Sequence, residues 1–363
     1  NTLQLGSGIT VSGTTVSANA QGDIVLDFGN GDSITLTNAL NSGSGKTYGV
    51  QSVQFVDGTV WHYADLLAAL ATPSVARTTL YGDTHANVLD GAGLARTLIG
   101  GGGGDTFIYN QGYGALTITE ADASSSPDNS LHLGAGLSAS SLAVSGNSNG
   151  DLILTFGADD TITLSKGFVD GGATTYGIQH VVFANGTTLT YGDLLTLALT
   201  PTASHTVLYG DGHANTLDGL GIAKTLIGAG GGDTLVYMKG YGLLTIDEAD
   251  TTATPDNVLM IGSELSAHDL TVTADANGNL ILNFGGGDQI TLVNALNSTN
   301  ITTYGVQSVH FADGSSLSYQ QLLALADTPS SSNTTLYGDT GANTLDGLGI
   351  AHTLVGNGGG DTF

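Results

Sequence analysis

Hydrophobic and polar residues alternate over several short stretches of this chain. Ile24, Leu26 and Phe28 are separated by Val25 and Asp27, and the same spacing recurs nearby. An alternation with a period of two buries one face of a β-strand. Clusters of glycine, asparagine and aspartate separate these stretches, as expected for turns. The pattern predicts an all-β chain made of short strands.

One stretch per unit departs from this alternation. The sequence "YADLLAAL" covers Tyr63 to Leu70, and "YGDLLTLAL" and "YQQLLALA" echo it further along. Thr-Pro follows each copy closely, and the residue before a proline disfavours the α-helical region. We therefore expect one helix of one or two turns at each of these places.

A second spacing marks the glycine-rich stretch 80–107. Leu80, Leu89, Leu98 and Phe107 lie nine residues apart. Two further series have the same spacing: Leu208, Leu217, Leu226 and Leu235, and then Leu336, Leu345, Leu354 and Phe363. A period of nine fits neither an amphipathic helix nor a flat antiparallel strand. It predicts a coil of turn-plus-strand steps in which the apolar residues point inward and stack on one another.

The whole chain repeats with a period of 128 residues. "NTLQLGSGI" at Asn1 returns as "NSLHLGAGL" at Asn129 and "NVLMIGSEL" at Asn257. The sequence therefore predicts three repeats, 1–128, 129–256 and a truncated 257–363, with glycine-rich stretches at 80–108, 208–236 and 336–363. Since the third copy stops before its unit is complete, we expect the ends to be cuts through a longer array.

The composition limits the kinds of molecule that the chain is expected to bind. The chain has 32 Asp and Glu against 6 Lys and Arg, a formal net charge of -26. Nucleic acids and anionic lipids need clustered cations, so this surplus argues against both and is compatible with divalent cations. Cysteine is absent, which excludes disulfides and thiolate metal sites. No apolar run approaches the roughly 18 residues of a membrane helix, and no signal peptide opens the sequence.

The glycine-rich stretch resembles the RTX (repeats-in-toxin) nonapeptide G-G-x-G-x-D-x-U-x, in which U is a large apolar residue. "GGGGGDTFI" from Gly100 fits it at every fixed position, while Ala229 and Asn357 replace the second glycine in the other copies. The flanking "LGAGLSASSL", "GDLILTFG" and "YGIQHVVFANGTTLTYGDLL" resemble the haemolysin-type calcium-binding-related domain. The resemblance implies a parallel β-roll, a form of β-solenoid, that binds Ca²⁺ between alternate turns along one edge.

In this frame the aspartate position is held by Asn87, Arg96 and Asp105 in successive turns. The resemblance places the first and third turns on one edge, so it implies one Ca²⁺ per repeat between Asn87 and Asp105, with Asp83 nearby. Glycines let backbone carbonyls turn toward the ion, which takes six to eight oxygens. The implied metal residues are Asp83, Asn87, Gly100, Gly102 and Asp105; Asp211, Asn215, Gly228, Gly230 and Asp233; and Asp339, Asn343, Gly356, Gly358 and Asp361. The middle turn, with Arg96, Lys224 or His352, should be metal-free, with the base as an internal counter-charge.

Other interpretations of the stretch fit less well. A flexible linker would not keep a leucine at every ninth position, and a phosphate loop needs a glycine followed by Lys and Ser or Thr. A dinucleotide fingerprint fails because Arg96 occupies its last glycine position. His85 and His213 are replaced by Gly341 in the third copy, which argues against a zinc or catalytic role.

Acidic residues outside the nonapeptides form a second group of candidates. Glu120, Asp122 and Asp128 lie in "ITEADASSSPD", which recurs as "IDEADTTATPD". They would form either a second oxygen site or a solvated acidic turn, and we favour the turn. Asp32, Asp160 and Asp288 are weaker candidates. The repeated tyrosines, such as Tyr81 and Tyr48, are expected to pack rather than to form a sugar-binding platform.

The sequence has no repeated catalytic constellation, so we expect a protein that is not an enzyme. The favoured function is a Ca²⁺-rigidified structural segment of a large bacterial tandem-repeat protein, such as an adhesin stalk, surface-layer component or extracellular fibre. Self-association into fibres or arrays is expected, and a glycan or cell-surface ligand is a further candidate partner. The resemblance implies type I secretion to the exterior or the cell surface. The alternatives are a Ca²⁺-dependent folding module attached to a secreted lipase, protease or epimerase, and a carbohydrate-binding module.

Overall fold

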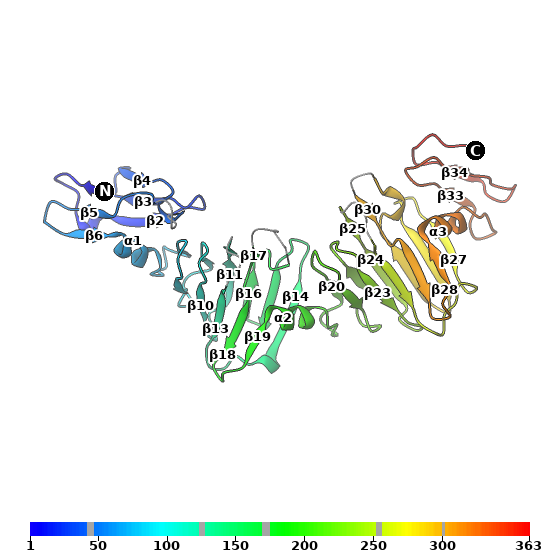
Figure 1. Cartoon of the computed structure of the whole chain (residues 1–363), viewed down its shortest axis with the longest axis horizontal. Coiled ribbons are helices and arrows are strands. Elements are labelled where there is room, and N and C mark those ends of the chain that lie inside the picture. The colour runs from blue at the N-terminus through cyan, green and yellow to red at the C-terminus, as the bar shows by residue number, and fades with distance from the viewer. Residues whose placement is uncertain (42–46, 123–127, 169–174, 252–255, 300–301) are drawn as a thin grey trace. The chain divides into compact units, whose positions relative to one another are not determined.

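The computed structural model describes residues 1–41, 47–122, 128–168, 175–251, 256–299 and 302–363 (Figure 1). The chain forms two compact units, 1–195 and 196–363, and each is described by itself. Strands dominate both units, as the alternation of residues predicts, and short α-helices accompany them.

The first unit contains two groups of elements. The first group consists of β1 (Thr2–Gln4), β2 (Thr15–Ala18), β3 (Ile24–Asp27), β4 (Ser33–Leu36), β5 (Ser52–Gln54), β6 (Val60–His62) and α1 (Tyr63–Leu70). The second group consists of β7 (Thr79–Tyr81), β8 (Val88–Asp90), β9 (Thr97–Ile99), β10 (Thr106–Tyr109), β11 (Ala115–Thr119), β12 (Ala121–Asp122), β13 (Ser130–Leu133), β14 (Leu142–Gly146), β15 (Leu152–Phe156), β16 (Asp160–Leu164), β17 (Thr175–Tyr176), β18 (His180–Phe183) and β19 (Thr188–Thr190). The helix α2 (Tyr191–Ala198) follows.

The second unit repeats the second group. It consists of β20 (Val207–Tyr209), β21 (Thr216–Asp218), β22 (Thr225–Ile227), β23 (Thr234–Tyr237), β24 (Leu243–Asp247), β25 (Ala249–Asp250), β26 (Val258–Ile261), β27 (Thr271–Ala274), β28 (Leu280–Gly285), β29 (Asp288–Leu292), β30 (Thr303–Tyr304), β31 (Ser308–Phe311), β32 (Ser316–Ser318) and α3 (Tyr319–Ala326). The final strands are β33 (Thr335–Tyr337) and β34 (Thr353–Val355).

The nine-residue spacing produces a run of parallel strands in each of two sheets. Strands β7, β9, β11 and β16 pair in parallel in one sheet, and β8, β10, β13 and β18 do so in the other. Successive nonapeptide strands therefore alternate between the sheets, so Leu80 lies opposite Leu98 and Leu89 lies opposite Phe107. All four side chains are fully buried, as the sequence predicts. Burial of such side chains contributes about 1.5–3 kcal/mol each.

Antiparallel strands complete both sheets. In one sheet β15 pairs with β16, and β14 pairs with β15; in the other, β19 pairs with β18. All three pairs are antiparallel. The sheets are open and mixed, so parallel pairing belongs to the nonapeptide strands and to the strands that adjoin them. The second unit has the same order, with β20-β22-β24-β29-β28-β27 in one sheet and β21-β23-β26-β31-β32 in the other.

These sheets join the glycine-rich stretch of one sequence repeat to the first strands of the next. Strand β10 precedes position 128 and pairs with β13, which follows it. Strand β23 pairs with β26 across position 256 in the same way. The sheets therefore do not begin and end with the 128-residue repeats, because the strands of each nonapeptide stretch pair with strands of the repeat that follows.

In the described residues, each 128-residue period contains one short α-helix, as predicted. In α1, Leu66 and Leu70 are four residues apart on one face and are buried in a core with Ile24, Leu26 and Val53. The side chain of Asp65 accepts a hydrogen bond from the backbone N–H of His62 at 2.7 Å, which satisfies a donor at the helix start. None of the helices in the described ranges has the length and apolarity to cross a membrane.

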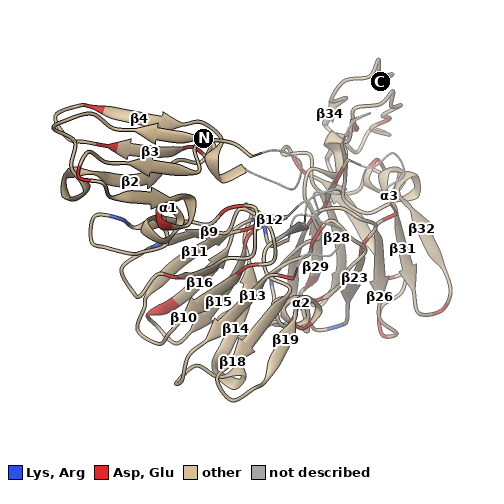
Figure 2. Cartoon of the chain, turned by 60° about the vertical axis from the view of Figure 1, so that its left-hand side comes forward, with Lys and Arg blue, Asp and Glu red and all other residues tan. Residues whose placement is uncertain are grey.

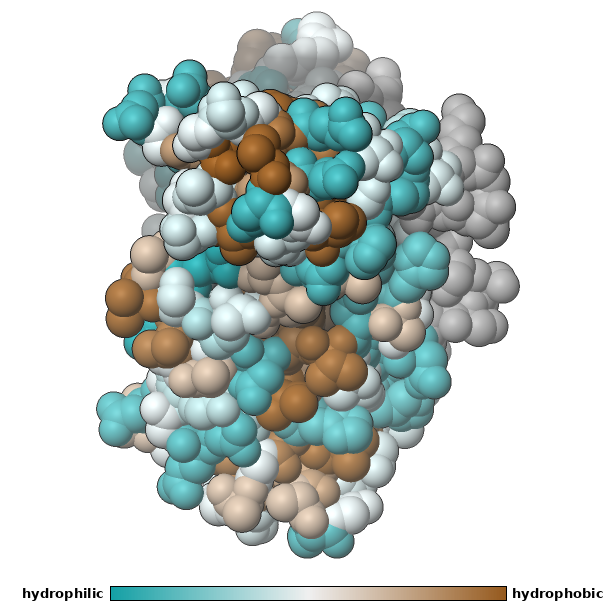
Figure 3. All heavy atoms as spheres, turned by 90° about the vertical axis from the view of Figure 1, so that its left-hand side faces the viewer, coloured by the Kyte–Doolittle hydropathy of each residue, from teal (hydrophilic) through white to brown (hydrophobic). Residues whose placement is uncertain are grey.

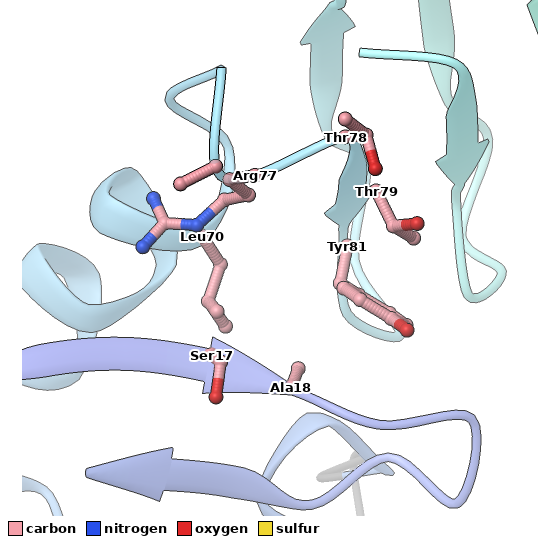
Figure 4. Close-up of a pocket in the computed structure, with 8 residues that line it drawn as sticks. Ser17, Ala18, Leu70, Arg77, Thr78, Thr79 and Tyr81 are labelled. Atoms are coloured by element: carbon pink, nitrogen blue, oxygen red, sulfur yellow. The ribbon is translucent and has the colours of Figure 1, made fainter. Parts of the chain in front are cut away.

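A small cavity of about 250 Å³ lies beside α1 (Figure 4). Ser17, Leu70, Arg77 and Tyr81 are among its lining residues. The guanidinium of Arg77 is turned toward the helix and donates hydrogen bonds to the carbonyl oxygens of Ala69, Thr72 and Val16. Arg77 therefore caps carbonyl groups at the C-terminal end of α1.

Candidate metal centre

One edge of the parallel sheets gathers oxygen atoms. The strands β7, β9 and β11 end there in register, and Gly82, Gly100 and Glu120 follow them directly. The N–H of Gly82 bonds the carbonyl of Ile99 at 2.8 Å, and that of Gly100 bonds the carbonyl of Thr119 at 3.1 Å. The turns that begin at these residues are therefore stacked along the edge.

A ladder of hydrogen bonds from backbone N–H groups to side-chain oxygens connects neighbouring turns. The backbone N–H of Asn87 donates to Oδ1 of Asp105 at 2.7 Å, and that of Asp105 donates to Oδ1 of Asn129 at 2.7 Å. The N–H of Asn129 then donates to Oε1 of Gln179 at 2.8 Å. The second repeat has the same ladder through Asn215, Asp233, Asn257 and Gln307, and the third has the bond from Asn343 to Asp361. The ladder uses Oδ1 of each aspartate and brings the first and third nonapeptide turns together.

The carboxylate of Asp83 is surrounded by donors from its own turn and from helix α1. It accepts hydrogen bonds from the N–H of His85 at 3.0 Å, from Nδ2 of Asn87 at 3.3 Å and from the hydroxyl of Tyr63 at 3.1 Å. Nδ1 of His85 lies 3.3 Å from its other side. Asp211 and Asp339 are held similarly. These aspartates therefore shape the turn, and Asn87 Oδ1 accepts the N–H of Asp83 at 2.6 Å.

The first glycine of each nonapeptide leaves room for carboxylate oxygens at the position where a Cβ atom would lie. A Cβ on Gly228 would lie 2.1 Å from Oδ2 of Asp233 and 2.1 and 2.4 Å from the two carboxylate oxygens of Glu248. A Cβ on Gly100 would lie 2.2 Å from Oδ2 of Asp105 and 1.7 Å from Oε2 of Glu120. The equivalent distance is 2.0 Å from Gly356 to Oδ2 of Asp361. Only glycine is compatible with this approach.

The remaining predicted glycines shape the tips of the turns. Gly102, Gly230 and Gly358 have φ angles of 99°, 91° and 114°, which side chains strongly disfavour. A Cβ on Gly230 would lie 3.7 Å from Oδ1 of Asp250. These glycines contribute a backbone conformation at the first variable position of the nonapeptide, where the motif itself does not require glycine.

The acidic pair of the second repeat is fully buried. Asp233 and Glu248 have 0% of their surface exposed, and Oδ2 of Asp233 and both carboxylate oxygens of Glu248 have no hydrogen-bond partner in the described part of the chain. Burial raises the pKa of Asp233 to about 7, and the charges of Asp211 and Asp250 add to this rise. Burial and then the charge of Asp233 raise the pKa of Glu248 to about 9.

This burial corrects one prediction from the sequence. The interpretation of 118–128 as a solvated acidic turn is wrong for Glu120, which is fully buried, and for its counterpart Glu248. It holds for Asp128, which is exposed and lies 3.6 Å from Nε2 of His180. The sequence grouped Glu120 with Asp128, whereas the structure places Glu120 beside Asp105.

The weaker candidates Asp160 and Asp288 have another role. Asp160 accepts the N–H groups of Gly112 and Gly114 at 3.0 and 3.1 Å and the hydroxyl of Tyr109 at 2.7 Å. Asp288 has the same set of donors. Because N–H and O–H groups surround both carboxylates, they are structural anions. Asp32, at the same position of the first repeat, is exposed.

The opposite edge carries the bases. Arg96 donates to the carbonyl of Tyr113 at 2.7 Å, and Nζ of Lys224 donates to the carbonyls of Gly221 and Tyr241 at 2.8 and 2.9 Å. The bases thus bind carbonyl oxygens of stacked turns on that edge. His352, at the third such position, is exposed.

The donors at the acidic edge suit a hard cation. Carboxylate and carbonyl oxygens are the ligands of Ca²⁺, and water completes its six to eight positions. The described ranges contain no group of three or more His, Cys, Asp or Glu side chains arranged to hold a metal, so carbonyls and water would have to supplement the acid pairs. Figure 2 shows acidic residues throughout the chain and few basic ones.

Comparison with known families agrees with this chemistry. Residues 23–65, 151–193 and 279–321 each match the haemolysin-type calcium binding protein related domain. Three segments, which together make up less than half of the chain, are thus similar to this calcium-binding-related domain, and the resemblance of the flanking sequences to that domain is confirmed. The matched segments run from β3 to α1 and their equivalents, so the nonapeptide turns lie outside them. No curated protein matches the chain.

Proposed function

We propose that this chain is a Ca²⁺-stabilised structural segment of a secreted bacterial tandem-repeat protein, such as an adhesin stalk, surface-layer component or extracellular fibre. The observation that carries the proposal is the stacking of Asn87 against Asp105, repeated at Asn215 and Asp233 and at Asn343 and Asp361. One ion per repeat would lie between these turns in a parallel β-roll. Its ligands would come from Asn87, Asp105 and the carbonyls of Gly100 and Gly102, with Asp83 supporting the turn.

The proposed role is mechanical and not enzymatic. The matched domains belong to a structural family, and the chain is built from copies of one unit. Tyr81 and Tyr337 pack against hydrophobic cores, which favours packing over sugar binding. Hydrophobic and hydrophilic side chains are interspersed on the face in Figure 3, as is usual for a protein surface.

The direct test is calorimetric titration of Ca²⁺ into the protein and into a triple variant, Asp105→Asn, Asp233→Asn and Asp361→Asn. Asparagine keeps the Oδ1 acceptor of the ladder and removes the negative charge. We expect the variant to bind the nonapeptide ions at least about tenfold more weakly, an affinity loss of about 1.4 kcal/mol per site. Asp32→Asn, which changes an exposed acid, is the matched control. A wild-type protein that takes up no Ca²⁺ at millimolar concentration would overturn the proposal.

The bases on the opposite edge provide a second expectation. Arg96→Ala and Lys224→Ala remove hydrogen bonds to carbonyls of exposed turns, so we expect a loss of less than about 1 kcal/mol in the free energy of unfolding. The number and affinity of bound Ca²⁺ ions should not change in the same titration. Loss of an ion in either variant would mean that the basic edge takes part in metal binding.

A further inference from the structure

We infer that Glu248 and Glu120 are ligands of an additional divalent-cation site in each of the first two repeats, one turn beyond the nonapeptide position. The inference rests on the proposed function, because it extends the same column of oxygens. Its ligands would be Oδ2 of Asp233 with the carboxylate of Glu248, and Oδ2 of Asp105 with the carboxylate of Glu120. The nonapeptide motif includes neither glutamate.

Distance is the first argument. Oδ2 of Asp233 and Oε1 of Glu248 each lie 2.1 Å from one point, the missing Cβ of Gly228. The two oxygens are therefore within about 4 Å of each other, and oxygens that share one Ca²⁺ at 2.3–2.6 Å meet this condition. The contacts of 1.7 and 2.2 Å at Gly100 place the carboxylates of Glu120 and Asp105 together in the same way.

Burial is the second argument. Glu248 is completely buried, and neither of its carboxylate oxygens has a hydrogen-bond partner among the described residues. Neither Glu248 nor Asp233 forms an ion pair with any described Lys, Arg or His. Two adjacent acids without a partner are costly in a protein interior, whereas acids that coordinate a metal are common there.

The surroundings favour a divalent cation. Asp247 and Asp250 contribute further negative charge at Glu248. Lys224, which could have neutralised this pair, binds carbonyls at the opposite edge. A protonated acid pair is the competing arrangement, and it predicts no response to calcium.

The test compares Glu120→Gln/Glu248→Gln with the wild type, with Asp256→Asn as the control that changes an exposed acid of the same segment. Equilibrium dialysis should show two fewer Ca²⁺ ions per chain, one for each glutamate. In EDTA the double variant should melt at the same temperature as the wild type or higher, because buried repulsion is removed. In saturating Ca²⁺ it should melt lower.

The outcomes separate the two proposals. Wild-type protein that binds no Ca²⁺ at all contradicts the proposed function and this inference together. Wild-type binding that the glutamine variant retains in full, with an unchanged calcium-dependent rise in melting temperature, overturns this inference alone and supports the protonated pair. The Asp→Asn triple variant, by contrast, should weaken both classes of ion, because Asp105 and Asp233 lie between them.

Discussion

Removal of calcium is expected to lower the unfolding temperature of both units by several degrees. If the nonapeptide sites bind with the 10⁻⁴ M affinity common in extracellular modules, 10 mM Ca²⁺ contributes about 2.7 kcal/mol per site, because the ion binds only the folded edge. For units of this size that corresponds to roughly 5–10 °C per site. The measurement is calorimetric melting in Ca²⁺ and in EDTA.

Charge screening must be separated from specific binding in this experiment. A chain with a net charge of -26 is stabilised by any added salt, since its carboxylates repel one another. Melting in Mg²⁺ and in KCl at matched ionic strength provides the control, because Mg²⁺ loses its water reluctantly and prefers octahedral sites. Identical melting curves in EDTA and in Ca²⁺ would contradict the calcium proposal.

Replacement of Asp160 or Asp288 by alanine is expected to cost about 3 kcal/mol or more at neutral pH. Each substitution leaves two backbone N–H groups without their acceptor, and each orphaned group costs about 1–3 kcal/mol. The buried tyrosine hydroxyl also loses one of its two acceptors and keeps the carbonyl of Gly114 or Gly242. Urea unfolding measures the loss. Asp32→Ala is the matched control, because the same repeat position is exposed there, and its effect should stay within about 0.5 kcal/mol.

This loss should depend on pH. Burial alone would raise the pKa of Asp160, but hydrogen bonds from Gly112, Tyr109 and Gly114 outweigh it and hold the pKa below the usual value. Because the folded pKa is lower than the unfolded one, the stabilisation is complete above the unfolded pKa near 4 and disappears as the pH falls through the folded pKa. The difference between Asp160→Ala and the wild type should therefore shrink in acid below pH 4. A difference that stays constant down to pH 2 would contradict this origin.

The periodicity of the sequence predicted the strands well because it reports burial directly. A leucine at every ninth position requires inward stacking, and Leu80, Leu89 and Leu98 are all buried. The same spacing brought Asn87 and Asp105 to one edge. The antiparallel strands around β15 are separate from this period, so nothing in the nine-residue pattern indicated that the sheets would be mixed.

The acids were harder to assign because their partners are distant in sequence. Glu120 lies 15 positions after Asp105, and its segment is as polar as an exposed turn. The burial of Glu120 can be recognised only from the pairing of β11 with β9 in the folded chain. Asp160 receives its hydrogen bonds from residues 46 to 51 positions earlier, and no local pattern marks that contact. Gly100 was the one local signal, because a glycine is required where a neighbouring carboxylate lies too close for a Cβ atom.

The pairing of β10 with β13, and of β23 with β26, bears on how such a gene can change length. Each nonapeptide block is completed by whatever copy comes next, and every copy begins with the same strand pattern. Unequal recombination between corresponding positions of two copies, which adds or deletes 128 residues, therefore restores an equivalent junction. Copy number can then vary without any new interface having to evolve.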